Sequence, residues 1–283
     1  MRVILCLSCA DRPGLVARVT DYLFRQGLNI EESHQFGDAQ SGQFFMRISL
    51  TATKKLSLPA LRRDFEPIAQ RFGMRARFSD ASQQMRVAIL VSKLDHCLTD
   101  LMHRQRTGRL PMQLRAIVSN HALARPLARQ AGVAFHHIPV PASAAGKRKA
   151  EARLQNICVK ERIQLLVLAR YMQILSPEFV AAWEGRIINI HHSFLPSFKG
   201  ASPYHQAFER GVKMIGATAH YVTAALDEGP IIAQDVVPVR HDMSVRSMTQ
   251  MGWEIEQRVL ARALGWHLHR RILLNGSKTV IFA

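Results

Sequence analysis

The sequence RIINIHHSFLPSFKG, residues 186–200, contains the strand and the loop around which the rest of the chain is arranged. Its apolar part, residues 186–190, predicts a short buried strand that ends at His191, where polar, Pro and Gly residues take over. Ligands of open α/β sheets bind just beyond the carboxyl ends of the strands. Asn189 and His191 are therefore candidate site residues by position as well as by type, and their spacing of two puts both side chains on one face.

Strands and helices are predicted to alternate on either side of this stretch. The predicted strands are residues 85–91, 114–119, 134–138, 165–169, 187–190, 216–222 and 231–239. Helices are predicted from about residue 97, at 122–130, 145–161 and 204–211, and over 244–270. This alternation favours a doubly wound, mostly parallel sheet. Asn275-Gly276 predicts a hairpin turn before a last strand at 279–282.

Residues 1–80 predict a separate, smaller α+β unit. Strands are expected at 2–10, 43–52 and 74–78, with one helix that ends near Gln26 and another over 60–72. These are five of the six elements of a β-α-β-β-α-β order. The polar segment DASQQ, residues 80–84, marks the boundary. The fold class is therefore α/β with two domains, residues 1–80 and 85–283, as expected for 283 residues.

Composition favours a globular protein of the cytoplasm. Hydrophobic residues make up 48% of the chain, without an apolar run long enough to span a membrane. The Pro-Gly turn that follows the first apolar run is more typical of a structural loop than of a cleavage site. The four Cys residues are too dispersed for a disulfide framework and are expected to be core thiols.

The net charge of +17 is the one extreme of the composition. Such a charge can attract nucleic acid, an acidic membrane surface or an anionic small molecule. The Lys and Arg residues are scattered, and aromatic residues make up only 7% of the chain, which does not suggest a platform for stacked bases. A generally basic surface is favoured and no nucleic-acid or membrane partner is expected, while RNA binding stays open as a third class of function.

Asn189, His191 and Asp227 together suggest acyl chemistry. An amide that binds a carbonyl oxygen, an imidazole that passes a proton, and a carboxylate that orients water or the imidazole suffice for acyl transfer or hydrolysis. The G-x-S-x-G elbow of a serine nucleophile is missing, which favours direct attack on the substrate. No metal is expected at His191 and His192, because no carboxylate or Cys stands at ligand spacing.

The sequence from Asn189 to Gln234, NIHHSFLPSFKGASPYHQAFERGVKMIGATAHYVTAALDEGPIIAQ, resembles the formyltransferase fold that uses 10-formyltetrahydrofolate. The resemblance covers residues 85–283. It implies that Asn189 polarises the formyl oxygen, that His191 transfers a proton, and that Asp227 positions the water and tunes His191. The folate-binding residues that it implies are Arg170, Tyr171, Met172, Gln173, Ile174, Leu175, Thr218, His220 and Gly229.

The smaller unit joined in front of LARYMQILSPE, residues 168–178, and NIHHSFLPSFKG, residues 189–200, resembles the arrangement of formyltetrahydrofolate deformylases, which are hydrolases. The turn SKLDHC, residues 92–97, lacks the glycines of a phosphate cradle, and the chain has no room for the extra barrel of methionyl-tRNA formyltransferases. The resemblance implies hydrolysis of 10-formyltetrahydrofolate without a prosthetic group, which balances one-carbon folate pools and supplies formate for purine synthesis. The alternatives are formyl transfer to an amine and an amino-acid sensor. Gly252-Trp253 and the basic charge are the departures from the family pattern.

The segment DRPGLVARVTDYLFRQGLNIEES, residues 11–33, resembles the ACT domain, a regulatory module. This resemblance implies an effector such as glycine or methionine, and a homo-oligomer, dimer or tetramer, that forms through these domains. Gly14 would let a ligand approach the backbone, and the helix start could hold a carboxylate. The candidate effector residues are Asp11, Arg12, Pro13, Gly14, Leu15 and Asn29.

Overall fold

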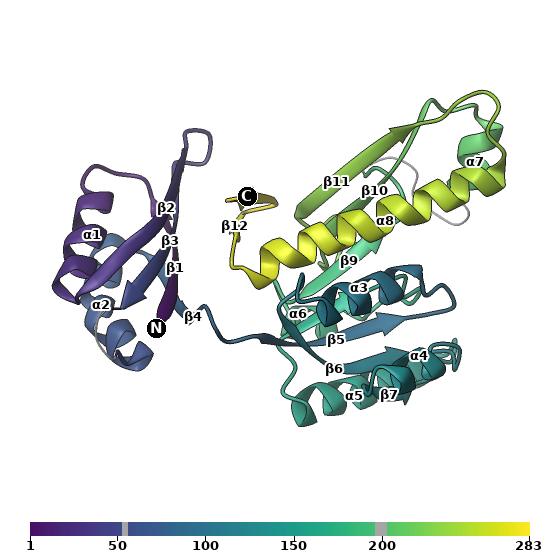
Figure 1. The fold of residues 1–283 in the computed structure, drawn as a ribbon, viewed down its shortest axis with the longest axis horizontal. Coiled ribbons are helices and arrows are strands. Elements are labelled where there is room, and N and C mark those ends of the chain that lie inside the picture. Colours follow the sequence, from purple (N-terminus) through teal and green to yellow (C-terminus); the bar gives the residue numbers. More distant parts are fainter. Residues whose placement is uncertain (53–55, 196–202) are drawn as a thin grey trace. The chain divides into compact units, whose positions relative to one another are not determined.

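A computed structural model describes residues 1–52, 56–195 and 203–283. The chain divides into two compact units, shown in Figure 1: Met1–Gln84 with His269–Ala283, and Met85–Leu268. The structure thus places residues 269–283 in the first unit, whereas the sequence prediction assigned them to the second domain.

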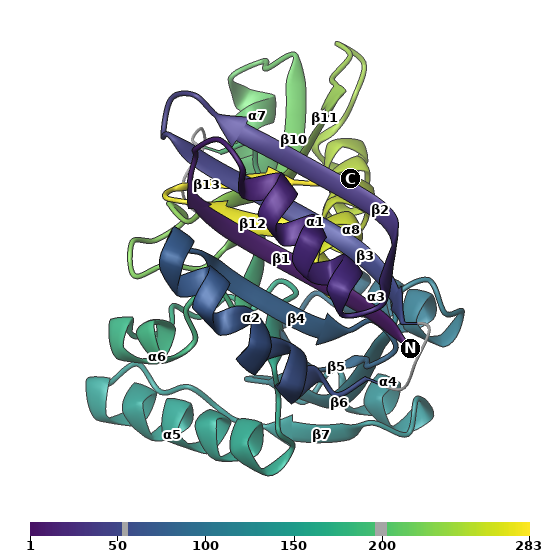
Figure 2. The same cartoon turned by 90° about the vertical axis from the view of Figure 1, so that its left-hand side faces the viewer.

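The first unit is a four-stranded antiparallel sheet with two helices on one face (Figure 2). Its elements are β1 (Arg2–Ala10), α1 (Leu15–Arg25), β2 (Leu28–Asp38), β3 (Gln43–Ala52), α2 (Leu58–Phe72) and β4 (Arg75–Asp80). The strand order β2-β3-β1-β4 is that of a ferredoxin-like split βαβ fold, and the predicted β-α-β-β-α-β order is confirmed. Pro59 lies in the first turn of α2, where a missing N–H costs no helical hydrogen bond.

The opposite face of this sheet contacts the C-terminal hairpin, β12 (Ile272–Asn275) and β13 (Lys278–Ile281). Phe45 of β3 forms a small apolar cluster with Leu273 and Phe282. The buried Arg47 donates hydrogen bonds to the carbonyls of Arg270 and His269, at 3.1 and 3.2 Å. These contacts explain why the end of the chain belongs to the first unit.

The second unit is built on a seven-stranded sheet of order β11-β10-β9-β8-β5-β6-β7. The strands are β5 (Met85–Val91), β6 (Met112–Ser119), β7 (Ala134–His137), β8 (Leu165–Leu168), β9 (Ile187–His191), β10 (Met214–Tyr221) and β11 (Ile231–Pro238). β5 to β9 pair in parallel, and β10 and β11 form an antiparallel edge. The predicted mostly parallel sheet is confirmed.

Helices cover both faces of this sheet. They are α3 (His96–Arg106), α4 (Arg125–Gln130), α5 (Ala144–Lys160), α6 (Pro177–Ala182), α7 (Pro203–Glu209) and α8 (Val245–Leu268). α3 and α8 pack together on one side, where α8 also crosses β9, β10 and β11. α5 and α6 share an apolar cluster with the other face of the sheet, which explains why the parallel strands are apolar on both sides.

The strand order positions the site. β8 and β9 are parallel neighbours, so their carboxyl ends meet at one edge of the sheet, where ligands bind in open α/β folds. β10 runs antiparallel beside β9 and pairs His220 with Asn189. All four Cys residues are free thiols, in agreement with the prediction. Among the helices of the described residues, none has the length and hydropathy needed to traverse a bilayer.

Candidate active site

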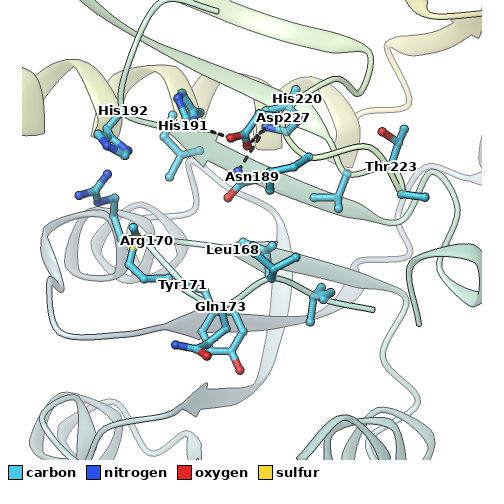
Figure 3. A pocket seen from close by; sticks show the side chains of 17 residues that line it. Leu168, Arg170, Tyr171, Gln173, Asn189, His191, His192, His220, Thr223 and Asp227 are labelled. Atoms are coloured by element: carbon cyan, nitrogen blue, oxygen red, sulfur yellow. Dashed lines mark hydrogen bonds and ion pairs between the residues drawn. The ribbon is translucent and has the colours of Figure 1, made fainter. Parts of the chain in front are cut away.

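Two strand ends and one loop bring four polar side chains together (Figure 3). Asn189 and His191 come from β9 and His220 from β10. Asp227 lies in the loop between β10 and β11 with a φ of 57°, a left-handed conformation that Asp adopts more readily than most residues. The structure thus brings together Asn189, His191 and Asp227, the set proposed from the sequence.

Asp227 contacts both imidazoles of the site. Its Oδ2 lies 3.2 Å from His191 Nδ1, and its Oδ1 lies 3.5 Å from His220 Nε2. The hydrogen bond from His191 and the proximity of His220 outweigh partial burial and hold the pKa of the Asp227 carboxyl well below its usual range. Asp227 is therefore a carboxylate at any pH near neutrality.

This carboxylate fixes the tautomer of His191. A carboxylate only accepts hydrogen bonds, so Nδ1 of His191 carries the proton that faces Asp227. In the neutral ring Nε2 is then the basic atom, and it is buried without a hydrogen-bond partner among the described residues. An oriented imidazole with one free, basic nitrogen is the arrangement of a general base.

Asn189 is oriented by His220. Nδ1 of His220 lies 2.9 Å from the Tyr221 carbonyl and donates to it, because that oxygen can only accept. Asn189 Nδ2 lies 3.2 Å from His220 Nε2. In the neutral ring Nε2 accepts one amide hydrogen of Asn189, which leaves the second hydrogen of this amide for a ligand oxygen.

These residues line a cavity of about 320 Å³. Its walls include the whole segment that the sequence assigned to folate, Arg170, Tyr171, Met172, Gln173, Ile174 and Leu175, together with His220, His192 and the candidate catalytic residues. The volume is at the lower end of the range for small-molecule sites, about 300 to 1,000 Å³.

Two of the residues assigned to folate are not in this lining. Thr218 is fully buried and accepts hydrogen bonds from the Leu195 amide and the Gln234 side chain, at 3.1 and 3.0 Å. It therefore fixes the start of the loop that follows β9. A Cβ on Gly229 would lie 1.7 Å from the Tyr221 carbonyl oxygen, so Gly229 is needed for close backbone packing beside the Asp227 loop. The Thr218 side chain is thus occupied in the interior of the protein and does not line the cavity.

The loop SFLPSFKG of the sequence prediction is described only through Leu195. Ser193 and Leu195 are buried and Phe194 is exposed. Residues 196–200 lie outside the described part of the chain.

Several residues that the sequence did not single out support the site. Ser92, in the glycine-free turn after β5, accepts a hydrogen bond from the Met172 amide at 3.0 Å, and its own amide donates to the Arg170 carbonyl at 3.2 Å. These contacts fix the segment that lines the cavity. Glu256 of α8 is fully buried and lies 3.5 Å from Arg170 Nε. A Glu within the apolar pattern of the last helix was the only sign of it in the sequence.

His96, Cys97 and Glu256 have donor atoms close enough together to share a metal ion. The surroundings do not suit a cation. Both Glu256 oxygens already accept hydrogen bonds, at 2.8 Å from His96 Nε2 and 2.7 Å from the Tyr204 hydroxyl. Burial and the Glu256 charge raise the pKa of the Cys97 thiol well above its ordinary value, which keeps it in the form that binds metals poorly.

The candidate effector residues lie in the first unit. Leu15 belongs to the core, and Gly14 precedes α1 with a φ of 88°, a conformation that suits glycine. Arg12 donates to the Arg71 carbonyl and lies over the Phe72 ring, while Asn29 is exposed on β2. A cavity of about 350 Å³ in this unit is lined by residues of β1, β3, β4 and the C-terminal hairpin, and none of the six is among them.

Known proteins share this sequence and fold. The formyl transferase family model matches residues 85–264. The chain is 44% identical to the formyltetrahydrofolate deformylase of Corynebacterium sp. (strain P-1), over 99% of this chain and 98% of the relative. The structure of the formyltetrahydrofolate deformylase from Burkholderia mallei ATCC 23344 matches with a TM-score of 0.94 and 47% identity, over 100% of this chain and 99% of that one.

A more distant likeness is to a transformylase. Glycinamide ribonucleotide transformylase 1 from Symbiobacterium toebii matches with a TM-score of 0.66 and 31% identity, over 73% of this chain and 97% of that one. The likeness to the deformylases extends over the whole chain and the likeness to the transformylase does not. The chain therefore belongs to the formyltetrahydrofolate deformylases of the formyl transferase family.

Proposed function

We propose that this protein hydrolyses 10-formyltetrahydrofolate to tetrahydrofolate and formate. The observation that carries the proposal is His191, whose Nδ1 is held by Asp227 and whose buried Nε2 is unpartnered among the described residues beside Asn189. Such a site can activate water next to a polarised carbonyl. Homology over nearly the full chain to deformylases supports the same reaction.

The roles of the three residues follow from their contacts. The free amide hydrogen of Asn189 binds the formyl oxygen, on which negative charge develops as water attacks. Nε2 of His191 accepts a proton from the attacking water and delivers it to the folate nitrogen as the carbon–nitrogen bond breaks. Asp227 orients His191 and stabilises its charged form. Water supplies the oxygen of formate, and no prosthetic group enters the reaction.

The folate is proposed to bind along residues 170–175. This segment is fixed to Ser92 by backbone hydrogen bonds and presents the side chains of Met172 and Ile174, which are 58% and 66% exposed. Exposed apolar side chains at a cavity rim suit a flat aromatic ring such as a pterin. The basic surface of the chain suits the glutamate carboxylates of folate.

The first unit is proposed to be an ACT-like regulatory domain. Its support is the ferredoxin-like strand order and the resemblance of residues 11–33. Glycine or methionine is the proposed effector, and a dimer or tetramer through this unit is the proposed assembly. In the cytoplasm, such an enzyme would balance one-carbon folate pools and supply formate for purine synthesis.

The test is the release of formate from 10-formyltetrahydrofolate without an added amine. The purified chain is expected to release formate and tetrahydrofolate in equal amounts. Product that forms only after an amine is added would instead identify an amine transferase. Adding glycine or methionine to the same assay tests the regulatory proposal, because an effector changes the rate and an unrelated amino acid such as serine does not.

A further inference from the structure

Four polar side chains from separate elements meet behind one wall of the catalytic cavity. Glu256 of α8 lies 2.8 Å from His96 Nε2, 2.7 Å from the Tyr204 hydroxyl and 3.5 Å from Arg170 Nε. We call His96, Arg170, Tyr204 and Glu256 the Glu256 cluster. Burial opposes the ionisation of Glu256, but the hydrogen bond from His96 and the charge of Arg170 outweigh it and hold the pKa of Glu256 below its ordinary value.

The Glu256 cluster lowers the stability of the folded state relative to an apolar core. Glu256 is 0% exposed, and well-packed apolar residues often serve stability better than a buried ion pair. Arg170 has a φ of 61°, a conformation that is strained for any residue with a side chain of this size. Buried charge and backbone strain at the rim of a cavity indicate a role in function.

The two departures noted in the last helix build this cluster. A Cβ on Gly252 would lie 2.1 Å from the Tyr204 ring, so a glycine lets Tyr204 approach α8 and reach Glu256. Trp253 stacks on His96, with ring centroids 5.1 Å apart and 13° between the planes. Gly252 and Trp253 thus hold two of the partners of Glu256 in place.

Arg170 connects the cluster to the site. Its side chain lines the cavity together with His191 and His192 (Figure 3) and is 10% exposed. Its Nε and Nη1 have no hydrogen-bond partner among the described residues, so Nε meets Glu256 as an ion pair. The His192 ring stacks on His191 at 5.0 Å. Arg170 therefore adds bulk and positive charge to the His191 side of the cavity.

We propose that Arg170, fixed by the Glu256 cluster, restricts the formyl acceptor to water. An amine must place its nitrogen at the formyl carbon beside His191, and the cavity must also hold the rest of the amine molecule. A water molecule needs only its own volume. An amine also arrives largely as a cation, which the guanidinium of Arg170 repels. The inference rests on the proposed hydrolysis.

The two outcomes differ only in the attacking atom. With water, a C–O bond forms, the C–N bond to the folate breaks, and one water proton moves through His191 to the folate nitrogen. With an amine, a C–N bond forms to the amine, the same folate bond breaks, and one amine proton moves to the folate nitrogen. Formate is the product of the first reaction and an N-formyl amine is the product of the second.

The test replaces Arg170 by glycine and offers glycinamide. Arg170→Gly removes bulk and charge and relieves the positive φ, while Glu256 keeps His96 and Tyr204 as partners. The ratio of N-formylglycinamide to formate is expected to rise about tenfold or more over the parent protein, the scale of discrimination that a change in pocket size supplies. Both products are quantified by mass spectrometry, against a reaction without protein.

Arg162→Gly is the matched control. Arg162 also has a positive φ, 52°, but it is exposed at the end of α5 and lies outside the cavity lining, so its product ratio should equal that of the parent. An Arg170→Gly protein that forms formate alone, or that loses both products while it still binds folate, would overturn the proposal. If the glycine variant does not fold, Arg170→Asn decides in the same way, because Asn also tolerates a positive φ.

The parent protein separates this inference from the function on which it rests. Formate release by the parent without amine supports the hydrolase proposal whatever the variants do. No release by the parent would remove that proposal and, with it, the inference that rests on it.

Discussion

Asp227 and Glu256 are both carboxylates that contact histidine, but they lie in different surroundings. Asp227 lines the cavity and contacts the two imidazoles of the site, His191 and His220. Glu256 is fully enclosed and contacts an imidazole, a phenol and a guanidinium. The comparison teaches that the pairing of an acid with histidine does not define a role. Contact with the cavity makes Asp227 a candidate for chemistry, and enclosure makes Glu256 a residue that holds shape.

The largest expected effect is that of Asp227→Asn on turnover. Without the carboxylate, His191 is no longer oriented with Nε2 as its basic atom, and kcat should fall about a thousandfold, within the range for general acid–base groups. KM should change little, because the loss concerns the transition state. Steady-state formate release measures both constants.

Asp235→Asn is the control for this prediction. Asp235 lies in the same unit and pairs with Arg258 at 2.9 Å, with the Arg258 side chain 52% exposed, so its variant should keep the parent turnover. An Asp227→Asn protein with kcat within about tenfold of the parent, less than such groups supply, would remove Asp227 from the mechanism.

The second effect is that of Glu256→Gln on stability. The substitution keeps the volume but removes the charge opposite the enclosed Arg170, and the loss of one partner of a buried pair costs about 3 kcal/mol of unfolding free energy. Turnover with water should fall far less than in Asp227→Asn. Urea denaturation measures the stability.

Glu161→Gln sharpens this contrast. Glu161 pairs with Arg115 at 2.9 Å, and the Arg115 side chain is 50% exposed. Loss of this ion pair should therefore lower the free energy of unfolding by no more than about 1 kcal/mol. Equal losses in the two variants, or a thousandfold drop in turnover for Glu256→Gln, would erase the distinction between the carboxylates.

The smallest effect concerns pH and His192, which lies between the two regions. Burial and the nearby charges of Arg170 and His191 lower the pKa of His192 from 6.5 to about 4. Between these values the unfolded chain binds the proton and the folded chain does not, so stability is lost as pH falls. Protonation of His192 in the unfolded chain should therefore lower the free energy of unfolding by about 2 kcal/mol between pH 7 and pH 5.

Urea denaturation of the parent and of His192→Gln at both pH values isolates this contribution, which should vanish in the variant. His205→Gln serves as the control, because the His205 side chain is 63% exposed and its variant should keep the parent slope. Asp227 does not interfere, since its depressed pKa makes its contribution disappear only below the ordinary carboxyl range. Identical slopes in all three proteins would show that His192 is charged or solvated in the folded state.

Much of the fold was predictable because its signals are local. The parallel strands are short apolar runs separated by helical patterns, as in β5 and β8, and the Asn275-Gly276 turn marks the last hairpin. β2 was not located, because its eleven residues are almost all exposed and its only strong support is pairing with β3. The six-residue α6 was missed because so short a segment has little helical periodicity.

The candidate site divides in the same way. The sequence by itself determined the pair Asn189 and His191, since a spacing of two on one strand is a local property, and it offered Asp227 as their partner. Resemblance to a family supplied the segment 170–175. Only the tertiary structure decided the rest. The antiparallel pairing of β9 and β10 placed His220 beside Asn189, the turn after β5 fixed the folate segment through Ser92, and α8 enclosed Glu256 behind Arg170. These contacts join residues far apart in the chain, and their geometry comes from packing, which no local pattern in the sequence encodes.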